Sequence, residues 1–389
     1  MKKKVDVVYV VASKLGSIGM GSAAYNAVKG IGHDGKLSFK VFCRGYDKRL
    51  GLNPKNVKSY GHLEYLSYPF RFLEKKMGIE TINYFKHINN LFGKLIFKNL
   101  PDCKIYHSWM GLAPEAVLKA KKGGAILVLE AANSHPLNTL KILNEEFKRY
   151  DREDLIVNPK TIQKEIDLIN KFDYVMCPSD FVYDSFLGQG FSKKQLVKMP
   201  YGVDLKKFST IKNREDNKFR IVFVGSLQLR KGVQYLLQAW GELKLKNAEL
   251  LIVGRVWPDA DEIVKRYKNN KTIKFIGFTK NLKYYYEMSD VFVFPSLEEG
   301  SSLATYEAMA SGLPSIVTFN SGSIARDEKD GFIIPIRDVK SLKKKISYFY
   351  DNPSEVKRMG KNARKFVEKY TWGNYGKNLI RAYKRMLKN

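Results

Sequence analysis

Two glutamates flank a Gly-Ser-Ser turn in the segment Pro295–Pro314, which reads PSLEEGSSLATYEAMASGLP. Glu299 precedes the turn and Glu307 follows it. The apolar run Val291–Phe294 before the turn is typical of a strand, and Leu303–Ala310 after it are strong helix formers. A helix start offers free N–H groups and a positive dipole end to a phosphate, while carboxylates accept hydrogen bonds from hydroxyl groups. The pattern suits a ligand with hydroxyls at both ends and phosphate in the middle, such as a nucleoside diphosphate sugar.

The composition bounds the class of protein. A chain of 389 residues is too long for one ordinary core, so we expect two domains. The net charge of +29 favours an acidic partner such as phosphate, anionic lipid or nucleic acid. Cys43, Cys103 and Cys177 are far apart and odd in number, which predicts reduced thiols in a cytosolic protein and no metal site. The apolar run after the N-terminal lysines is too short for a membrane span and has no signal cleavage pattern.

Short apolar runs alternate with helical stretches along the chain. Nearly continuous Val, Ile and Phe runs separated by helices are typical of parallel sheets covered on both faces. A run that leads into a glycine-containing turn and a helix occurs twice, so we predict an α/β protein with two Rossmann-like halves. The predicted strands are Val5–Val11, Phe39–Cys43, Ile105–His107, Ala125–Glu130, Tyr174–Cys177, Arg220–Val224, Glu249–Val253, Ile273–Ile276, Val291–Phe294 and Ser315–Thr318.

We expect the boundary between the halves near Pro200–Asp204, which reads PYGVD. Beyond it, Thr210–Lys218 is polar and charged, as a surface linker would be. We therefore assign residues 1–203 to an acceptor-side domain and residues 204–372 to a nucleotide-sugar-binding domain. Residues 373–389 belong to an amphipathic helix that is expected to return to the first domain.

In combination, four features resemble the family 4 retaining glycosyltransferases of GT-B fold. They are the Glu-x7-Glu pair, the Lys-Gly turn after the mid-chain strand, the PYGVD boundary and the terminal helix that contains a tryptophan. The resemblance covers almost the whole chain. It implies two Rossmann-like domains facing each other across a cleft, a nucleotide-sugar donor held mainly by the C-terminal half, and no bound metal or other cofactor.

Within this resemblance, the acidic segment divides into roles. Glu307 is expected to accept hydrogen bonds from the ribose hydroxyls, since a carboxylate suits a vicinal diol. Glu299 is expected to contact hydroxyls of the transferred sugar. Glu298 is the neighbouring alternative, and the family pattern favours Glu299 because it directly precedes the glycine. Ser302 and Leu303 are expected to offer backbone amides to the diphosphate.

Two turns are expected to contact the diphosphate from opposite domains. Arg230 and Lys231 would neutralise it as the sugar leaves, because fixed cations stabilise developing phosphate charge. Many relatives carry arginine where this chain has Ser226, and we expect Arg230 to take over that charge. Gly19 and Gly21 follow the first strand and, without Cβ atoms, would let the backbone approach the diphosphate.

Functional groups collect at the carboxyl ends of strands in parallel sheets. Two of the five histidines follow first-domain strands. By resemblance, His135 would contact the donor sugar or polarise the acceptor; His107 and Asn133 are weaker candidates. Phe278 lies in the turn that would meet the base, and the sequence leaves open whether the donor carries uridine or guanosine.

The predicted function is transfer of a sugar from a UDP- or GDP-sugar to a hydroxyl of a glycan or lipid-linked acceptor, by a metal-independent hexosyltransferase. The resemblance implies retention of anomeric configuration by a front-side route. Two alternatives stay open: a non-catalytic basic protein that binds nucleic acid or anionic membrane, and an inactive GT-B subunit. No nucleic-acid partner is expected, because the chain has no helix-turn-helix, zinc or RNP-type signature.

A basic amphipathic region is the candidate contact with a membrane. It predicts a cytoplasmic enzyme that is peripheral on the inner face of the membrane and rests on anionic lipid. An ordinary surface helix pair is the alternative reading. The region, Phe70–Asn99, mixes Lys75, Lys76, Lys86, Lys94 and Lys98 with Phe72, Tyr84, Phe85, Phe92 and Phe97.

Overall fold

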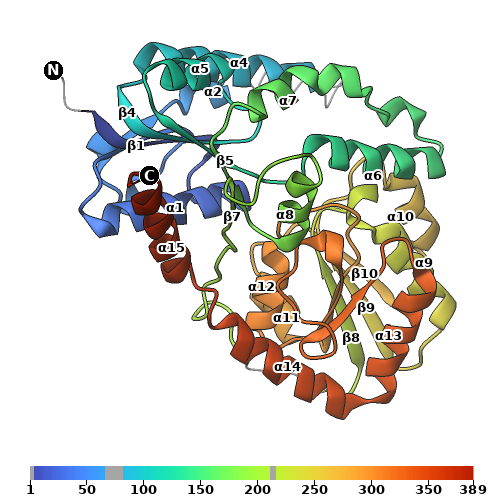
Figure 1. The fold of residues 1–389 in the computed structure, drawn as a ribbon. Helices are drawn as coiled ribbons and strands as arrows, with labels where there is room; N and C mark the ends of the chain where they lie inside the picture. The colour runs from blue at the N-terminus through green and yellow to red at the C-terminus, as the bar shows by residue number, and fades with distance from the viewer. Residues whose placement is uncertain (1–3, 66–81, 211–215, 389) are drawn as a thin grey trace.

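The structure is a computed structural model that describes residues 4–65, 82–210 and 216–388. It contains two separate parallel sheets, each covered by helices on both faces (Figure 1). The sheet of the first domain has the order β3-β2-β1-β4-β5-β6-β7, and that of the second has the order β10-β9-β8-β11-β12-β13. The predicted α/β class with two Rossmann-like halves is therefore confirmed.

The strands of the first sheet are β1 (Val5–Lys14), β2 (Phe39–Gly45), β3 (Val57–Ser59), β4 (Cys103–Trp109), β5 (Ile126–Glu130), β6 (Tyr174–Cys177) and β7 (Leu196–Lys198). Those of the second sheet are β8 (Phe219–Val224), β9 (Ala248–Val253), β10 (Ile273–Gly277), β11 (Val291–Phe294), β12 (Ser315–Thr318) and β13 (Gly331–Ile334). All ten predicted strands appear. The three that were not predicted, β3, β7 and β13, are short edge strands.

The helices of the first domain are α1 (Met20–Asp34), α2 (His62–Tyr65), α4 (Ile82–Asn99), α5 (Pro114–Lys122), α6 (Pro136–Arg149), α7 (Gln163–Ile169) and α8 (Asp180–Leu187). The second domain has α9 (Val233–Leu243), α10 (Asp261–Tyr267), α11 (Leu282–Glu287), α12 (Leu303–Ala310), α13 (Val339–Asp351) and α14 (Pro353–Val367), and the last helix is α15 (Trp372–Met386). Short 3-10 turns are η1 (Lys48–Leu50), η2 (Pro54–Asn56), η3 (Glu153–Leu155), η4 (Pro159–Ile162), η5 (Leu229–Lys231) and η6 (Phe319–Ser321).

Strand β1 shows why these runs are almost entirely apolar. Val7 and Tyr9 point into the core beneath α1, whereas Val8 and Val10 point into the core beneath α4 and α5. Because both faces of a parallel sheet are buried, the strand has no solvent side on which polar residues could alternate. The carboxyl ends of the strands are thus held rigidly, and the turns that follow them carry the chemistry.

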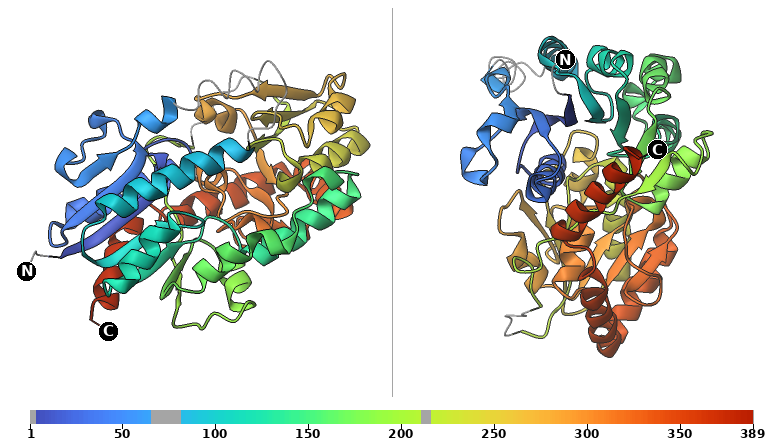
Figure 2. Two further views of the ribbon diagram at one scale, coloured as in Figure 1. Left: turned by 90° about the horizontal axis from the view of Figure 1, so that it is seen from above. Right: turned by 60° about the vertical axis from the view of Figure 1, so that its left-hand side comes forward.

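The last helix returns to the first domain and packs against α1 (Figure 2). At the crossing, a Cβ on Gly30 would lie 2.7 Å from the Cα of Gly376, so the two backbones touch. Lys384 forms a 2.8 Å ion pair with Asp34 near the end of both helices. The connection between the domains is also tight, because a Cβ on Gly202 would lie 2.4 Å from the Trp372 nitrogen.

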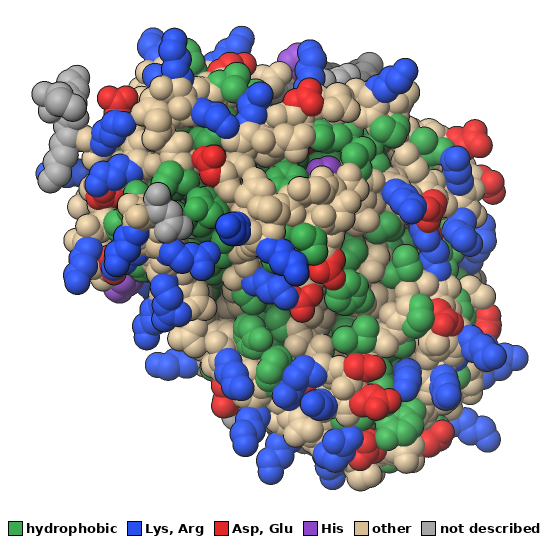
Figure 3. All heavy atoms as spheres, viewed as in Figure 1, with side chains coloured by type: hydrophobic (Ala, Val, Ile, Leu, Met, Phe, Trp, Pro, Cys, Tyr) green, Lys and Arg blue, Asp and Glu red, His purple; other side chains and the backbone are tan. Residues whose placement is uncertain are grey.

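Within the described residues, every helix is too short or too polar to cross a bilayer. Part of the amphipathic membrane region, including Phe72, Lys75 and Lys76, lies outside the described residues. In the described part of α4, Phe92 is buried and Phe97 is about half exposed. Lys and Arg side chains are spread over the face in Figure 3 and alternate there with acidic groups.

Candidate active site

The acidic turn after β11 lies against the first domain. Its glycine, Gly300, explains how closely the domains approach, because a Cβ there would lie 1.9 Å from the carbonyl oxygen of Ala132. Ala132 belongs to the loop between β5 and α6, residues 131–135, which we call the β5–α6 loop. The strand–turn–helix that carries Glu299 therefore contacts the loop that carries Asn133 and His135.

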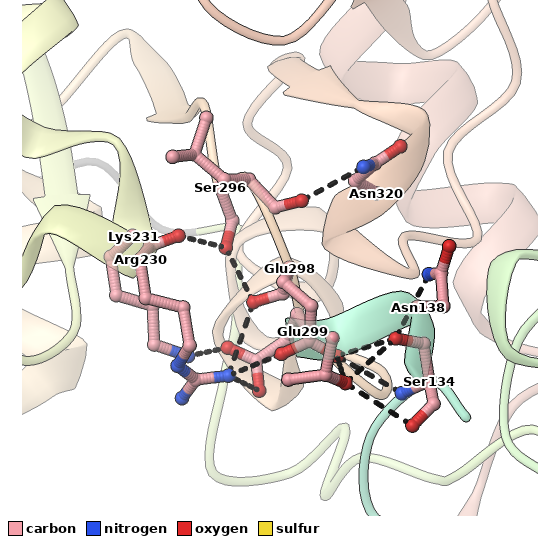
Figure 4. A network of polar contacts seen from close by, with 10 residues as sticks. Ser134, Asn138, Arg230, Lys231, Ser296, Glu298, Glu299 and Asn320 are labelled. Atoms are coloured by element: carbon pink, nitrogen blue, oxygen red, sulfur yellow. Dashed lines mark hydrogen bonds and ion pairs between the residues drawn. The ribbon is translucent and has the colours of Figure 1, made fainter. Parts of the chain in front are cut away.

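Four charged side chains meet at this contact (Figure 4). Arg230 Nη1 donates to the Glu298 carboxylate at 3.1 Å and lies 3.7 Å from Glu299. Lys231 is in contact with Glu299. Burial and Arg230 lower the pKa of Lys231, while Glu298 raises it. Each cation faces a carboxylate, so the formal charges of the four groups cancel.

Glu298 was only the alternative in the sequence, yet it makes the most contacts. Its side chain is fully buried. One carboxylate oxygen, Oε1, accepts from the backbone N–H and the hydroxyl of Ser134, both at 3.0 Å, and lies 3.2 Å from the Thr139 hydroxyl. The other oxygen accepts from Arg230. No local signal predicts this, because Ser134 and Glu298 are 164 residues apart.

A second buried carboxylate joins the domains further along α6. Glu146 Oε1 accepts from Gln234 at 2.8 Å and from the Tyr235 hydroxyl at 2.7 Å. Glu146 Oε2 accepts from the Arg337 guanidinium at 2.7 Å. A small apolar cluster of Ile142, Phe181, Tyr235 and Leu297 packs beside these contacts. Helix α6 of the first domain is therefore attached to the second domain along its length.

Glu307 lies in the second turn of α12 and lines a cavity of about 340 Å³ between the domains. The cavity is also lined by Gly16 and Ser22 of the first domain, by Lys207 just after the domain boundary, and by Leu303. Burial raises the pKa of Glu307 to about 7, while the Tyr286 hydroxyl, which donates to it at 3.0 Å, and Lys207 oppose the shift. A carboxylate that gives up its proton near neutral pH is therefore available at this cavity.

In the glycine turn and at the start of α12, only some backbone positions are open to a ligand. Gly19 has φ +72 and open space where a Cβ would be, so a ligand can approach it. At Gly21 a Cβ would lie 2.2 Å from the Lys14 carbonyl oxygen, which means that the turn itself requires this glycine. The Ser302 N–H donates to the Ser321 carbonyl at 3.3 Å, and Leu303 lines the cavity. Roles of these residues toward a diphosphate stay predictions.

The two histidines are buried in different surroundings. His135 caps α6 through Nδ1, which accepts from the Leu137 N–H, and its ring packs against Phe186. Burial lowers the pKa of His135 to about 4, so the ring is neutral at physiological pH. His107 lies between Glu130 and the Tyr383 hydroxyl of α15. In this structure His107 connects the sheet to the returning helix, away from the four charged groups.

Phe278 lies just after β10, apart from the charged groups. Phe278 is 50% exposed, and the Arg255 guanidinium lies 4.9 Å from its ring centroid. Among the described residues, no group of three or more His, Cys, Asp or Glu side chains is arranged to hold a metal ion.

The raised pKa of Glu307 predicts a pH-dependent stability. Its folded-state pKa of about 7 exceeds the ordinary value of 4.5, so the folded protein holds this proton more strongly than the unfolded chain. The stabilisation is full below about pH 4.5 and is lost as the pH rises through about 7. Glu307→Gln mimics the protonated form and does not titrate. The melting temperature of the variant minus that of wild type should therefore increase as the pH rises from 5 to 8. The effect has an upper limit of about 3 kcal/mol.

Thermal unfolding of both proteins across this pH range measures the difference, and other titrating groups cancel in the comparison. A melting-temperature difference that stays constant with pH would contradict the assigned pKa.

Comparison with known proteins locates the family resemblance in the second domain. Residues 205–366 match the family model described as glycosyl transferases group 1. An uncharacterized glycosyltransferase of Methanocaldococcus jannaschii is 30% identical over 44% of this chain and 46% of its own length. An α-(1→4)-mannosyltransferase of Mycolicibacterium hassiacum is 29% identical over 50% of each chain. The chain thus spans about half the length of such curated relatives.

Solved structures match the fold over nearly the whole chain. A sucrose-phosphate synthase from Thermosynechococcus elongatus gives a TM-score of 0.71 at 17% identity and covers 99% of this chain and 100% of its own. HepE of Anabaena, solved with UDP and glucose, gives 0.67 at 13% identity and covers 98% and 99%. Two facing Rossmann-like domains of this kind make up the GT-B fold. Residues 205–366 thus match the glycosyl transferases group 1 model, and the chain as a whole has the GT-B fold.

Proposed function

We propose that this protein is a retaining glycosyltransferase that moves a sugar from a UDP- or GDP-sugar to a hydroxyl of a glycan or lipid-linked acceptor. The observation that carries the proposal is the joining of Arg230, Lys231 and Glu299 in one cluster between the domains. Glu307 lies in the next helix and lines the cavity between the same domains. Cations for a diphosphate and carboxylates for sugar hydroxyls are thus available in one region.

The names of similar proteins support this chemistry. A relative in Escherichia coli, 31% identical over 37% of this chain, is a galactosyltransferase named for UDP-Gal and a GlcNAc-diphosphoundecaprenol acceptor. A relative in Acholeplasma laidlawii, 25% identical over 62% of this chain, is an α-monoglucosyldiacylglycerol synthase. HepE has been solved with UDP-glucose. Nucleotide-sugar donors and lipid-linked acceptors therefore occur among proteins that this chain resembles.

The charge balance of the cluster defines how a donor would bind. Arg230 and Lys231 are compensated by Glu298 and Glu299, so an incoming diphosphate meets a neutral site. Glu299 is the less enclosed of the two acids, with 15% of its side chain exposed. We infer that Glu299 leaves Lys231 when the diphosphate arrives and turns to the hydroxyls of the transferred sugar. The two cations then stabilise the leaving phosphate.

The proposed chemistry follows from this arrangement. Arg230 and Lys231 supply the positive charge that a leaving diphosphate needs, which supports a metal-independent reaction. Retention by a front-side route, in which the leaving phosphate helps to deprotonate the acceptor hydroxyl, needs no separate nucleophile from the protein. Gly19 and Leu303 approach the gap from opposite domains and are the proposed backbone contacts.

A panel of UDP- and GDP-sugars, scored by thermal stabilisation and by slow donor hydrolysis, tests the function. A ligand that binds the folded state raises its melting temperature by mass action. We expect one donor to stabilise the wild type, and Glu307→Ala to abolish that shift. Glu262→Ala on α10 removes an exposed helix glutamate and serves as the control.

Once a donor and an acceptor are known, NMR of the product assigns the anomer. An inverted product would exclude the retaining mechanism. A wild-type protein that neither binds nor hydrolyses any sugar nucleotide would refute the function itself.

Glu299→Gln should separate binding of the nucleotide from transfer of the sugar. Without the competing carboxylate, Lys231 is free for phosphate, so UDP or GDP should bind roughly 3- to 10-fold more tightly, or about 1 kcal/mol. Transfer should nevertheless fall by about 100-fold, because a contact to the reacting sugar is lost. Titration calorimetry and initial rates measure the two effects. Glu262→Gln removes the same charge from the surface, and equal tightening there would show that only net charge matters.

We also propose a cytoplasmic protein that rests on the inner face of an anionic membrane. The support is the basic composition and the partly exposed Phe97, over which Lys119 lies at 5.1 Å from the ring centroid. Flotation with vesicles that contain anionic lipid should carry the protein at low salt and release it at high salt. Equal binding to neutral vesicles, or no binding at low salt, would contradict this.

A further inference from the structure

We propose that Glu298 is a positioning residue. It holds the Arg230 guanidinium in place only while the β5–α6 loop is packed against the Glu298 carboxylate. The proposal rests on the proposed function, because that function assigns Arg230 to the leaving diphosphate. It adds that the packing of the two domains against each other controls the orientation of Arg230, the cation proposed to bind phosphate. Glu298 would act through Arg230, without touching the donor.

The two oxygens of one carboxylate contact two different domains (Figure 4). Oε1 takes its hydrogen bonds from the first domain, from the backbone N–H and hydroxyl of Ser134 and from Thr139. Oε2 takes a 3.1 Å hydrogen bond from Arg230 Nη1. The same Nη1 also donates to the Glu298 backbone carbonyl at 3.1 Å. The Arg230 side chain remains 23% exposed and has further N–H donors for a phosphate.

Burial makes these contacts interdependent. A fully buried carboxylate is stable only when its oxygens are paired and hydrogen-bonded. If the β5–α6 loop and the first turn of α6 move away, Oε1 loses its donors from Ser134 and Thr139 and opens to water. Glu298 then has no fixed position, and the guanidinium that it holds loses its orientation. A displacement of about 1 Å at a catalytic group can cost about 100-fold in rate.

The adjacent glutamates therefore have different tasks. Glu299 is partly exposed and contacts Lys231, so it can exchange partners when a ligand arrives. Glu298 is fully enclosed, and to reach a sugar it would have to break its contacts with both domains. The β5–α6 loop also carries Asn133 and His135. Its packing therefore fixes the positions of these two side chains and, through Glu298, the position of Arg230.

Glu146 provides a matched control within the same interface. It is also a fully buried glutamate that joins the two domains, and it is held by Gln234, Tyr235 and Arg337. None of its partners belongs to the cluster around Arg230. Glu146→Gln therefore weakens the attachment of the domains without releasing Arg230, whereas Glu298→Gln does both.

The experiment compares these variants with wild type, using UDP and GDP for binding and hydrolysis of the donor found in the panel for rate. Glu298→Gln keeps an oxygen for Ser134 but loses the charge that faces Arg230. We expect its kcat to fall by about 10- to 100-fold with less than about a threefold change in donor KM. Glu146→Gln should change kcat by less than about threefold, although both variants lower the melting temperature.

A double-mutant cycle tests the coupling directly. Ser134→Ala with Thr139→Val removes the two hydroxyl donors to Oε1, one from the loop and one from α6, and leaves the Glu298 and Arg230 side chains themselves unchanged. This pair should lower kcat in the wild-type background and have little further effect in the Glu298→Gln background, because interacting sites are non-additive. Should Glu298→Gln fail to fold, a lower kcat at unchanged donor KM in the Ser134→Ala, Thr139→Val variant supports the proposal, and an unchanged kcat overturns it.

The remaining outcomes are distinct. Equal losses of kcat in Glu298→Gln and Glu146→Gln, or strictly additive effects in the cycle, would overturn the positioning role while leaving the proposed function intact. A wild-type protein without nucleotide binding or donor hydrolysis would overturn both.

Discussion

The arrangement of the gap depends on one constraint, which is that charges removed from water need partners. Burying an ion without a counterion costs several kcal/mol, so Arg230 and Lys231 can occupy the interface only together with Glu298 and Glu299. This pairing places cations and carboxylates side by side and leaves the cluster neutral. A site built in this way is stable when empty and must exchange an internal partner for an external one when it is filled.

The same constraint explains why α6 matters beyond its own domain. It begins at the β5–α6 loop, which serves Glu298, and it continues to Glu146, which is held by Arg337 and Tyr235. One helix of the first domain therefore supplies two buried polar contacts to the second. The apolar cluster around Ile142 packs beside these contacts. The geometry of the charged groups is thus set by the interface as much as by the turn that carries them.

Much of this protein can be predicted from its sequence where the signal is local. The strands inside the sheets are nearly continuous apolar runs because both faces are buried, and the sequence pattern predicts all of them, even β6, β11 and β12 with four residues each. The unpredicted strands β3, β7 and β13 have three or four residues and lie at sheet edges, where pairing on one side only leaves a weaker pattern. The strand–turn–helix pattern located Glu299, Arg230 and Glu307. Contacts between distant residues leave no such signal. Nothing in the sequence around Ser134 predicts its contact with Glu298. The contact of His107 with Tyr383, 276 residues away, is equally invisible in the sequence.

The returning helix has a mechanical consequence. The chain crosses between the domains twice, once near Val203 and once near Thr371, and the two crossings form a parallel bridge to each other. Two adjacent tethers permit bending about the line between them but resist twisting about the long axis. Relative motion of the two domains is therefore restricted to bending about this line. Such bending keeps the same side chains facing each other across the gap.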